Sequence, residues 1–192
     1  MKPLLYAPIC PLLLLAQAAQ AATPAPPSVP TSSYKSTIAD VGTGFAIALP
    51  VIATGVTVFK HDRAGAAELL VTTLLSMGTV YALKNIVHEE RPDGSGMHAF
   101  PSENTALAAS SADFLWGRYG WSYGLPAFAA SSFVSFSRTQ AKKERWYDTA
   151  TSSVIAAVFS LSITKRFKQR YNIRTQLSAA PNGGFASLSY EW

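Results

Sequence analysis

Four stretches without a charged side chain follow residue 40, at 41–59, 69–83, 119–137 and 149–164. A further segment at 102–117 has a helical pattern and carries Asp113. Together these segments predict five helices. Several are shorter than the roughly 20 apolar residues that cross a bilayer and are rich in small residues, so hydropathy leaves a membrane-spanning bundle and a soluble bundle both open.

Basic residues mark alternate connections between the expected helices. If the chain starts from an exported N-terminus, the connections expected in the cytoplasm hold Lys60, Arg63, Arg118, Lys165, Arg166, Lys168 and Arg170. This is a positive-inside pattern. The connections on the other side are basic as well, so the pattern favours a membrane topology without deciding it.

The two ends of the chain differ from the helical region. Residues 1–21 place Lys2 before an apolar run and a small-residue segment, which predicts a signal peptide cleaved after Ala21; an uncleaved first membrane helix is the alternative. Residues 22–34 are rich in Pro and Ser and predict an extended linker. We therefore expect a helical domain at 35–170 and a tail at 171–192, where a turn signal between alternating runs predicts a β-hairpin.

The composition excludes several classes of protein. The 192 residues are 14% charged, with a net charge of +5 and no acidic or basic tail. They contain no repeat of the length that builds solenoids. The single cysteine, Cys10, rules out an internal disulfide framework and a cysteine-based zinc site. We expect no metal, no cofactor and no nucleic-acid partner.

Two cations precede a helix start in the middle of the chain. Lys84 and Arg91 are seven residues apart, nearly two helical turns, so on one continuous helix ended by Pro92 both would project on one side. Ser102 then begins an Ala-rich run, and as an N-cap it would leave free backbone N–H groups for an anion. Taken singly, these residues have ordinary explanations, because basic side chains also complement the end of a helix dipole.

A third group lies near residue 140. Arg138 is followed by Glu144 and Asp148, and a separation of four residues places the two carboxylates on one helical face. Arg138 alone is explained equally well as an anchor at a membrane surface. The three groups are more informative together than singly, because three cations and a helix N-terminus are suited to bind a phosphoryl group.

This order and spacing resemble the type-2 phosphatidic-acid phosphatase superfamily, which includes bacterial lipid phosphatases, soluble acid phosphatases and vanadium haloperoxidases. The superfamily pattern is Lys-x6-Arg-Pro, then Pro-Ser-Gly-His, then Ser-Arg-x5-His-x3-Asp. The chain has Lys84-x6-Arg91-Pro92, then Pro101-Ser102-Glu103-Asn104, then Ser137-Arg138-x5-Glu144-x3-Asp148. Eight positions match with the same spacings, and the resemblance covers about residues 35–170. It implies an all-α helical bundle.

The resemblance also implies roles for individual residues. Four matched residues would hold the phosphate: Lys84, Arg91, Ser102 and Arg138. The histidine that attacks phosphorus in the superfamily falls at Glu144, and the aspartate that orients it falls at Asp148. The histidine that protonates the leaving group falls at Asn104.

Both catalytic histidines are therefore replaced. Asn104 cannot act as a general acid near neutral pH, and Glu144 as a nucleophile would need a magnesium site and a new acid that the sequence does not offer. Glu103 takes the place of a glycine that lets the phosphate approach. We expect Glu144 and Glu103 to pair with the cations as an internal substitute for phosphate. His98, three residues before Pro101, is either a replacement acid or a surface-loop histidine.

These inferences lead to a degenerate member of the superfamily, a pseudophosphatase that binds a phosphorylated lipid, an inorganic oxyanion or an envelope protein partner. The expected location is the bacterial inner membrane with the site facing the periplasm, and a soluble periplasmic bundle is the alternative. Two other functions stay open. One is an active lipid phosphatase with a rearranged site, and the other is a structural subunit of an envelope complex.

Overall fold

A computed structural model describes residues 31–167, 172–180 and 183–191 of the chain. The predicted signal peptide at 1–21 lies outside the described residues, as do residues 22–30 of the predicted linker. Lys168, Arg170 and the turn of the predicted hairpin at 181–182 also lie outside them.

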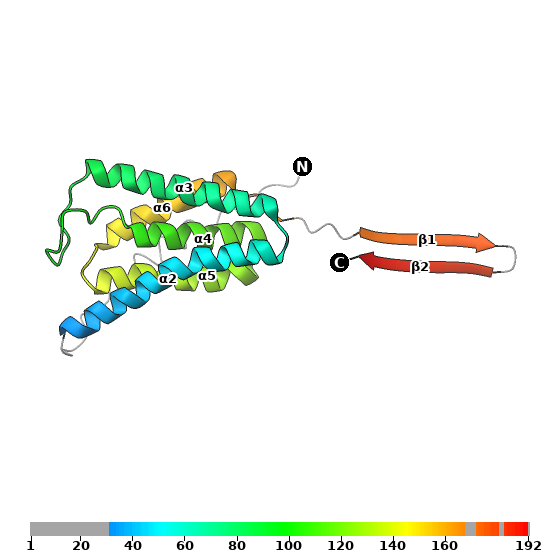
Figure 1. The fold of residues 1–192 in the computed structure, drawn as a ribbon, viewed down its shortest axis with the longest axis horizontal. Coiled ribbons are helices and arrows are strands. Elements are labelled where there is room, and N and C mark those ends of the chain that lie inside the picture. The colour runs from blue at the N-terminus through cyan, green and yellow to red at the C-terminus, as the bar shows by residue number, and fades with distance from the viewer. Residues whose placement is uncertain (1–30, 168–171, 181–182, 192) are drawn as a thin grey trace.

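Helices make up most of the described chain (Figure 1). They are α2 (Thr31–Phe59), α3 (Arg63–Ile86), α4 (Glu103–Tyr119), α5 (Trp121–Gln140) and α6 (Trp146–Ile163). Each covers one of the five segments expected from the sequence, so the predicted helical bundle is confirmed. Because α2 begins at Thr31, residues 31–34 of the predicted linker are helical.

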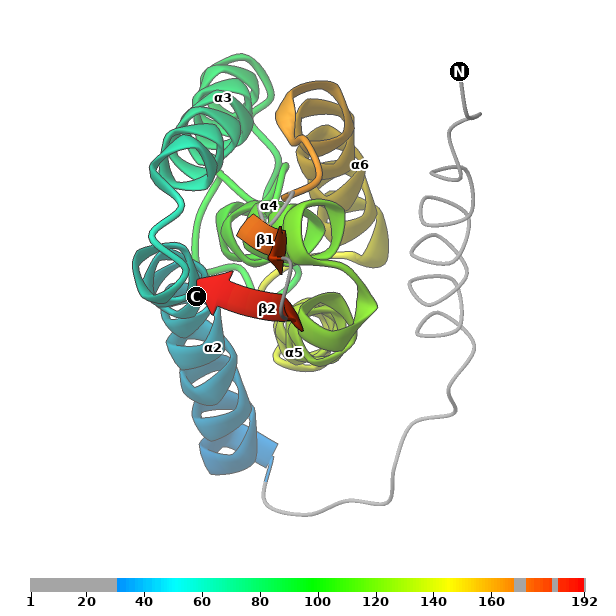
Figure 2. The ribbon, with the colours of Figure 1, turned by 90° about the vertical axis from the view of Figure 1, so that its right-hand side faces the viewer.

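α4 is the central helix of the bundle. It packs against each of the other four described helices, which surround it when the bundle is viewed along its length (Figure 2). Ala106, Ala108, Ala109 and Ala112 of α4 are completely buried. Because alanine has so small a side chain, the neighbouring helices approach closely and the interior is close-packed by small residues.

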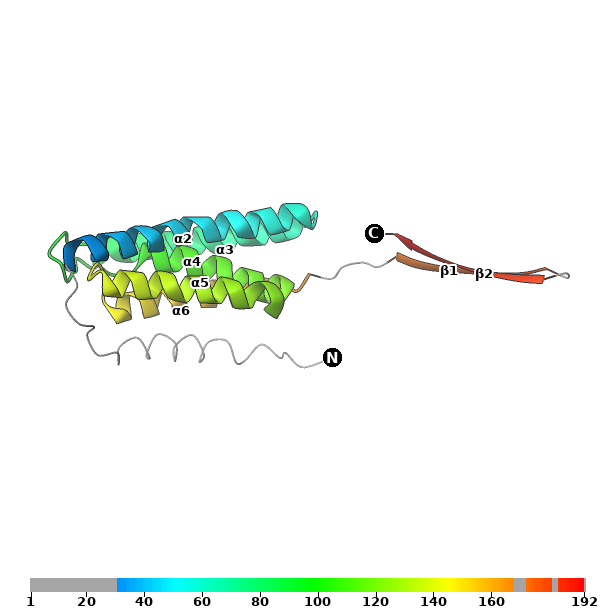
Figure 3. The same cartoon turned by 90° about the horizontal axis from the view of Figure 1, so that it is seen from below.

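α2 and α3 run side by side along the bundle (Figure 3) and present apolar side chains outward. Val51, Val58 and Phe59 on α2, and Leu70 and Leu74 on α3, are each more than half exposed. Both helices are long and apolar enough to cross a membrane, and most residues of their apolar stretches are not buried. An apolar face of this extent suits lipid better than water.

The C-terminal region contains two strands, β1 (Asn172–Ala180) and β2 (Gly183–Glu191). They pair antiparallel in a two-stranded sheet, with Asn172 opposite Glu191 and Ala180 opposite Gly183. The strands lie where the sequence predicts a hairpin.

Candidate active site

Four helix ends meet at one end of the bundle: the ends of α3 and α5 and the starts of α4 and α6. The N–H of Ser102, just before α4, donates to the carbonyl oxygen of Asp148 in the first turn of α6 at 3.3 Å. Lys143 and Asp93 join the α5–α6 and α3–α4 connections through an ion pair of 2.6 Å. These contacts gather the three sequence motifs at one place in the fold.

Glu144 is paired with Arg138. Nη2 of Arg138, in the last turn of α5, lies 3.2 Å from Oε1 of Glu144, and both side chains are buried. The N–H of Glu144 also donates to the carbonyl oxygen of Arg138 at 3.4 Å. The predicted pairing of Glu144 with a cation of the motifs is therefore confirmed.

Close packing of α2 against α5 positions Arg138. A Cβ atom on Gly42 would lie 1.8 Å from Oγ of Ser137, the residue before Arg138, so this approach requires glycine. The Ser137 hydroxyl donates to the carbonyl oxygen of Val134 at 2.6 Å. The serine of the Ser-Arg motif thus packs inside the bundle while the arginine points to the cluster.

Lys84 is buried in the last turn of α3. Its Nζ donates to the carbonyl oxygen of His98 at 2.8 Å and lies 3.9 Å from Oε1 of Glu103. The expected pairing of Glu103 with a cation is therefore present, at a longer distance than the Glu144 pair. The charges of Glu144 and Asp148 also act on Lys84, so the two ion pairs belong to one electrostatic cluster.

Arg91 does not lie on α3, and the prediction of one continuous helix to this residue is wrong. The helix ends at Ile86, Val87 is extended, and Arg91 follows in the connection. Its N–H makes no helical hydrogen bond and donates instead to the carbonyl oxygen of Gly96 at 2.8 Å. Its side chain is half-buried, and none of the ion pairs within the described residues includes it.

Asp148 caps α6 rather than sharing a helical face with Glu144. The helix begins at Trp146, so Glu144 precedes it and the prediction of a common face is wrong. Oδ2 of Asp148 accepts the N–H of Arg145 at 2.6 Å. Three atoms of this cluster are buried without a hydrogen-bond partner in the described part of the chain: Oδ1 of Asp148, Oε2 of Glu144 and Nε of Arg138.

Ser102 is the N-cap of α4, as the sequence predicts. Its Oγ accepts the N–H of Thr105 at 3.1 Å and donates to the Thr105 hydroxyl at 2.9 Å. Glu103 and Asn104 follow in the first turn, and both are half-buried. The amide of Asn104 can donate or accept hydrogen bonds but does not titrate, so Asn104 cannot act as a general acid.

The connection after α3 is held to the start of α6 by residues that the sequence analysis does not identify. Arg145 pairs with Glu89 and donates to the carbonyl oxygen of Glu90 at 3.0 Å, and the Tyr147 hydroxyl also donates to Glu89. These contacts hold the connection that follows the end of α3 at Ile86. The one available sequence signal is the position of Arg145 directly after the motif carboxylate.

A second ion pair holds the same connection. Nζ of Lys143 lies 2.6 Å from Oδ2 of Asp93 and donates to the hydroxyl of Ser95 at 3.4 Å. Burial acts to raise the pKa of the Asp93 carboxyl, but Lys143 and Ser95 outweigh it and hold that pKa well below its usual value. The α3–α4 connection is therefore fixed at two points against the α5–α6 connection.

Two comparisons with known proteins bear on this arrangement. The chain is 28% identical over 159 residues to Lipid A 4'-phosphatase of Helicobacter pylori, an alignment that covers 75% of this chain and 80% of the relative. The crystal structure of Aquifex aeolicus LpxE matches with a TM-score of 0.57 and 18% identity, covering 78% of this chain and 92% of that chain, so the two share a fold. Both matches agree with the resemblance of the sequence motifs to the type-2 phosphatidic-acid phosphatase superfamily. No family model matches it.

The histidines of this chain lie at other positions than those of the superfamily pattern. His88 and His98 both lie in the α3–α4 connection, with ring centroids 5.6 Å apart. Both are exposed, and it is the backbone oxygen of His98 that contacts Lys84. Within the described residues, no group of three or more His, Cys, Asp or Glu side chains could hold a metal ion.

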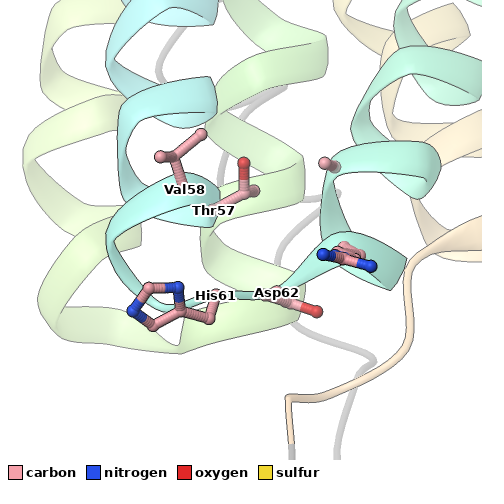
Figure 4. Close-up of a pocket in the computed structure, with 6 residues that line it drawn as sticks. Thr57, Val58, His61 and Asp62 are labelled. Atoms are coloured by element: carbon pink, nitrogen blue, oxygen red, sulfur yellow. The ribbon is translucent and has the colours of Figure 1, made fainter.

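The opposite end of the bundle holds a cavity that is separate from the superfamily motifs. It has a volume of about 310 Å³ and lies between the end of α2 and the start of α3 (Figure 4). Its lining residues are Thr57, Val58, His61, Asp62, Arg63 and Ala66. His61 therefore lies away from the candidate site.

Beside this cavity, Arg118 engages both carboxylate oxygens of Asp62. Its Nε and Nη2 donate at 2.7 and 2.6 Å, and the N–H of Gly65 and the hydroxyl of Tyr119 donate to the same carboxylate at 2.9 Å. Burial acts to raise the pKa of Asp62, but these hydrogen bonds outweigh it and hold the pKa below its usual value. Arg118 also contacts the half-buried Glu68 at 3.2 Å, so this end of the bundle has its own arginine–glutamate pair.

Proposed function

We propose that this protein is a membrane-embedded, lipid-phosphatase-like envelope protein that binds the phosphate of a lipid headgroup without hydrolysing it. The observation that carries the proposal is the 3.2 Å ion pair between Glu144 and Arg138. In the superfamily pattern, these two positions hold the attacking histidine and a phosphate-binding arginine. Arginine binds carboxylates and phosphates through the same N–H donors. The carboxylate of Glu144 therefore takes the place that a phosphate oxygen would have at Arg138.

The remaining groups favour binding over hydrolysis. Hydrolysis of a phosphate ester needs a nucleophile and an acid for the departing oxygen. Asn104 cannot supply the proton, and Asp148 is tied to the N–H of Arg145 as a helix cap. Binding needs only the cations Lys84, Arg91 and Arg138 with the N-terminus of α4, all of which the chain retains.

A phosphorylated lipid is the ligand class that the surroundings support best. The Helicobacter pylori relative is by name a Lipid A 4'-phosphatase, and α2 and α3 have the length and composition of membrane spans. If these helices cross the bilayer, the site at the end of the bundle lies at the headgroup level. The basic residues Lys60, Arg63 and Lys165 belong to the opposite end and favour the cytoplasm, so the site would face the periplasm.

Purified full-length protein in detergent micelles tests this function. Inorganic phosphate and a phosphorylated lipid should each raise the unfolding temperature. The same sample should release no phosphate from phosphatidic acid, polyprenyl diphosphate or an aryl phosphate above the buffer blank. Arg138→Gln should lose the phosphate-dependent shift. Phosphate release that Arg138→Gln abolishes would contradict the proposal, and the absence of both release and shift would support a structural subunit instead.

An active phosphatase with a rearranged site is the second candidate, and the location of His98 favours it. Its backbone oxygen accepts a hydrogen bond from the Lys84 ammonium at 2.8 Å. Its ring lies beside that of His88, so two imidazoles lie close to the cationic cluster. In that case His98 would protonate the leaving oxygen. Phosphate release that His98→Ala abolishes and His61→Ala preserves would support this candidate, because His61 lies at the opposite end of the bundle.

A further inference from the structure

The candidate site carries as many carboxylates as cations. Its charged side chains are Lys84, Arg91, Arg138, Glu103, Glu144 and Asp148. The neighbouring pair of Arg145 and Glu89 is neutral by itself. The cluster is therefore close to neutral before any ligand arrives, and an incoming phosphate would bring negative charge that the site does not balance.

Two of these carboxylates have a buried oxygen with no donor. Oε2 of Glu144 and Oδ1 of Asp148 lack a hydrogen-bond partner among the described residues, and the two residues are 3% and 0% exposed. The charge of Glu144 acts on Asp148, so the two groups interact. Two buried carboxylates that interact resist being ionised together, and one proton between them also supplies the missing donor.

Arg138 has the complementary deficit. Its Nη2 is used by Glu144, but its Nε is buried without an acceptor in the described part of the chain. A tetrahedral oxyanion has several acceptor oxygens, so it can accept hydrogen bonds from both Nε and Nη2 of Arg138. An acceptor beside Nε of Arg138, and a proton shared by the two carboxylates, would together give all three unpartnered atoms a hydrogen bond.

We propose that the site takes up a phosphate group together with one proton, which Glu144 and Asp148 then share. This inference rests on the phosphate binding proposed above. On binding, the carboxylate of Glu144 leaves Arg138 and a phosphate oxygen takes its place. A proton from solvent then joins Oε2 of Glu144 to Oδ1 of Asp148. No covalent bond to phosphorus forms or breaks, and the added proton offsets part of the charge of the ligand.

The charged groups around this carboxyl pair and its neighbour Lys84 come from several elements. α3 contributes Lys84, the α3–α4 connection contributes Glu89 and Arg91, and α4 contributes Glu103. The remaining two are Arg138 at the end of α5 and Arg145 before α6. Among these groups, the carboxyls of Glu144 and Asp148 are the ones with a buried oxygen that lacks a donor in the described part of the chain, so the proton is assigned to them.

Sulfate is the probe that isolates the proton taken up by the protein, because it is a tetrahedral dianion that does not itself titrate near neutral pH. We would measure sulfate binding to the full-length protein in detergent by titration calorimetry at pH 5.5, 6.5 and 7.5 and constant ionic strength. Uptake of one proton predicts a dissociation constant that rises about tenfold per pH unit. For the wild type, the binding heat measured in buffers of different ionisation enthalpy should give an uptake of about one proton for each sulfate bound.

Glu144→Gln should flatten this dependence to less than about threefold per pH unit and tighten sulfate binding at pH 7.5. The matched control is Glu68→Gln, which removes the charge of the other glutamate that lies 3.2 Å from an arginine. This half-buried residue is at the opposite end of the bundle, so the variant should keep the tenfold slope. Sulfate binding that is independent of pH in the wild type, or a steep slope that persists in Glu144→Gln, would overturn the proton coupling. No sulfate binding at any pH in either protein would overturn the phosphate site itself.

Discussion

The carboxylate of Glu144 and the guanidinium of Arg138 form a buried ion pair, with Oε1 and Nη2 3.2 Å apart. Arg138 lies in the last turn of α5 and Glu144 in the connection that follows. The pair therefore forms within one corner of the chain and does not need a ligand to hold it. A phosphate that binds at Arg138 must therefore compete with the carboxylate of Glu144.

Removing the charge of Glu144 should both weaken the fold and strengthen its response to anions. In Glu144→Gln, the cations of the cluster lose a balancing charge, so the free energy of unfolding should fall by about 1–3 kcal/mol. Phosphate, sulfate or vanadate should then raise the unfolding temperature more than in the wild type. Thermal unfolding in detergent, with and without each anion, measures both effects. A variant with unchanged stability and an unchanged anion response would show that Glu144 does not occupy the cationic site.

Restoring one histidine should not restore catalysis. Glu144→His supplies a nucleophile, but Asn104 still leaves the departing oxygen without an acid. We expect measurable phosphate release from phosphatidic acid in mixed micelles only when Asn104→His and Glu103→Gly are added, the latter reopening the approach to the site. A Glu144→His protein that turns over as fast as the triple variant would show that the acid is supplied elsewhere.

The helices of this fold could be read from the sequence because each apolar stretch is bounded by charges or by turn residues. α4 was also marked by Ser102, whose side chain caps the helix as predicted. The pairing of Glu144 was predictable from charge balance, because the motifs place cations around it. Local pattern was sufficient for these features.

The course of the chain between α3 and α4 could not be predicted in the same way. The spacing from Lys84 to Arg91 places both on one face only if the helix continues, and it stops at Ile86. Beyond that point the connection is held by the contact of Glu89 with Arg145, which are 56 residues apart in the chain. Such a pair is set by the packing of whole helices, and a sequence pattern within one segment carries no sign of it.

The network of Asp62 and Arg118 should make stability depend on acid. The folded-state pKa of Asp62 is lowered, so its contribution is fully present above the unfolded pKa of about 4 and is lost as pH falls through the folded pKa. Asp62→Asn should lower the free energy of unfolding at pH 7 by about 3 kcal/mol, because Arg118 loses its buried partner. Unfolding measured from pH 7 to pH 3 should show the difference between the two proteins narrowing below pH 4. A constant difference over this range would argue against a lowered pKa.

The two ends of the bundle should lie on opposite sides of the membrane. Ser95 lies in the α3–α4 connection and Ala64 at the start of α3, and both are exposed. In a chain with Cys10 replaced by serine, Ser95→Cys should react with an impermeant thiol reagent in intact spheroplasts and Ala64→Cys should not. Equal labelling of the two positions would contradict a membrane-spanning bundle and favour a soluble periplasmic one.

The central claim is that this protein binds phosphate groups without hydrolysing them, because Glu144, paired with Arg138, takes the place of the histidine nucleophile. The most direct measurement is the rate of phosphate release from a lipid phosphomonoester by the full-length wild type, compared with Glu144→Gln and with a protein-free blank. We predict that both proteins stay at the rate of the blank. A wild-type rate above the blank that disappears in Glu144→Gln would identify the carboxylate as a nucleophile or base and contradict the claim.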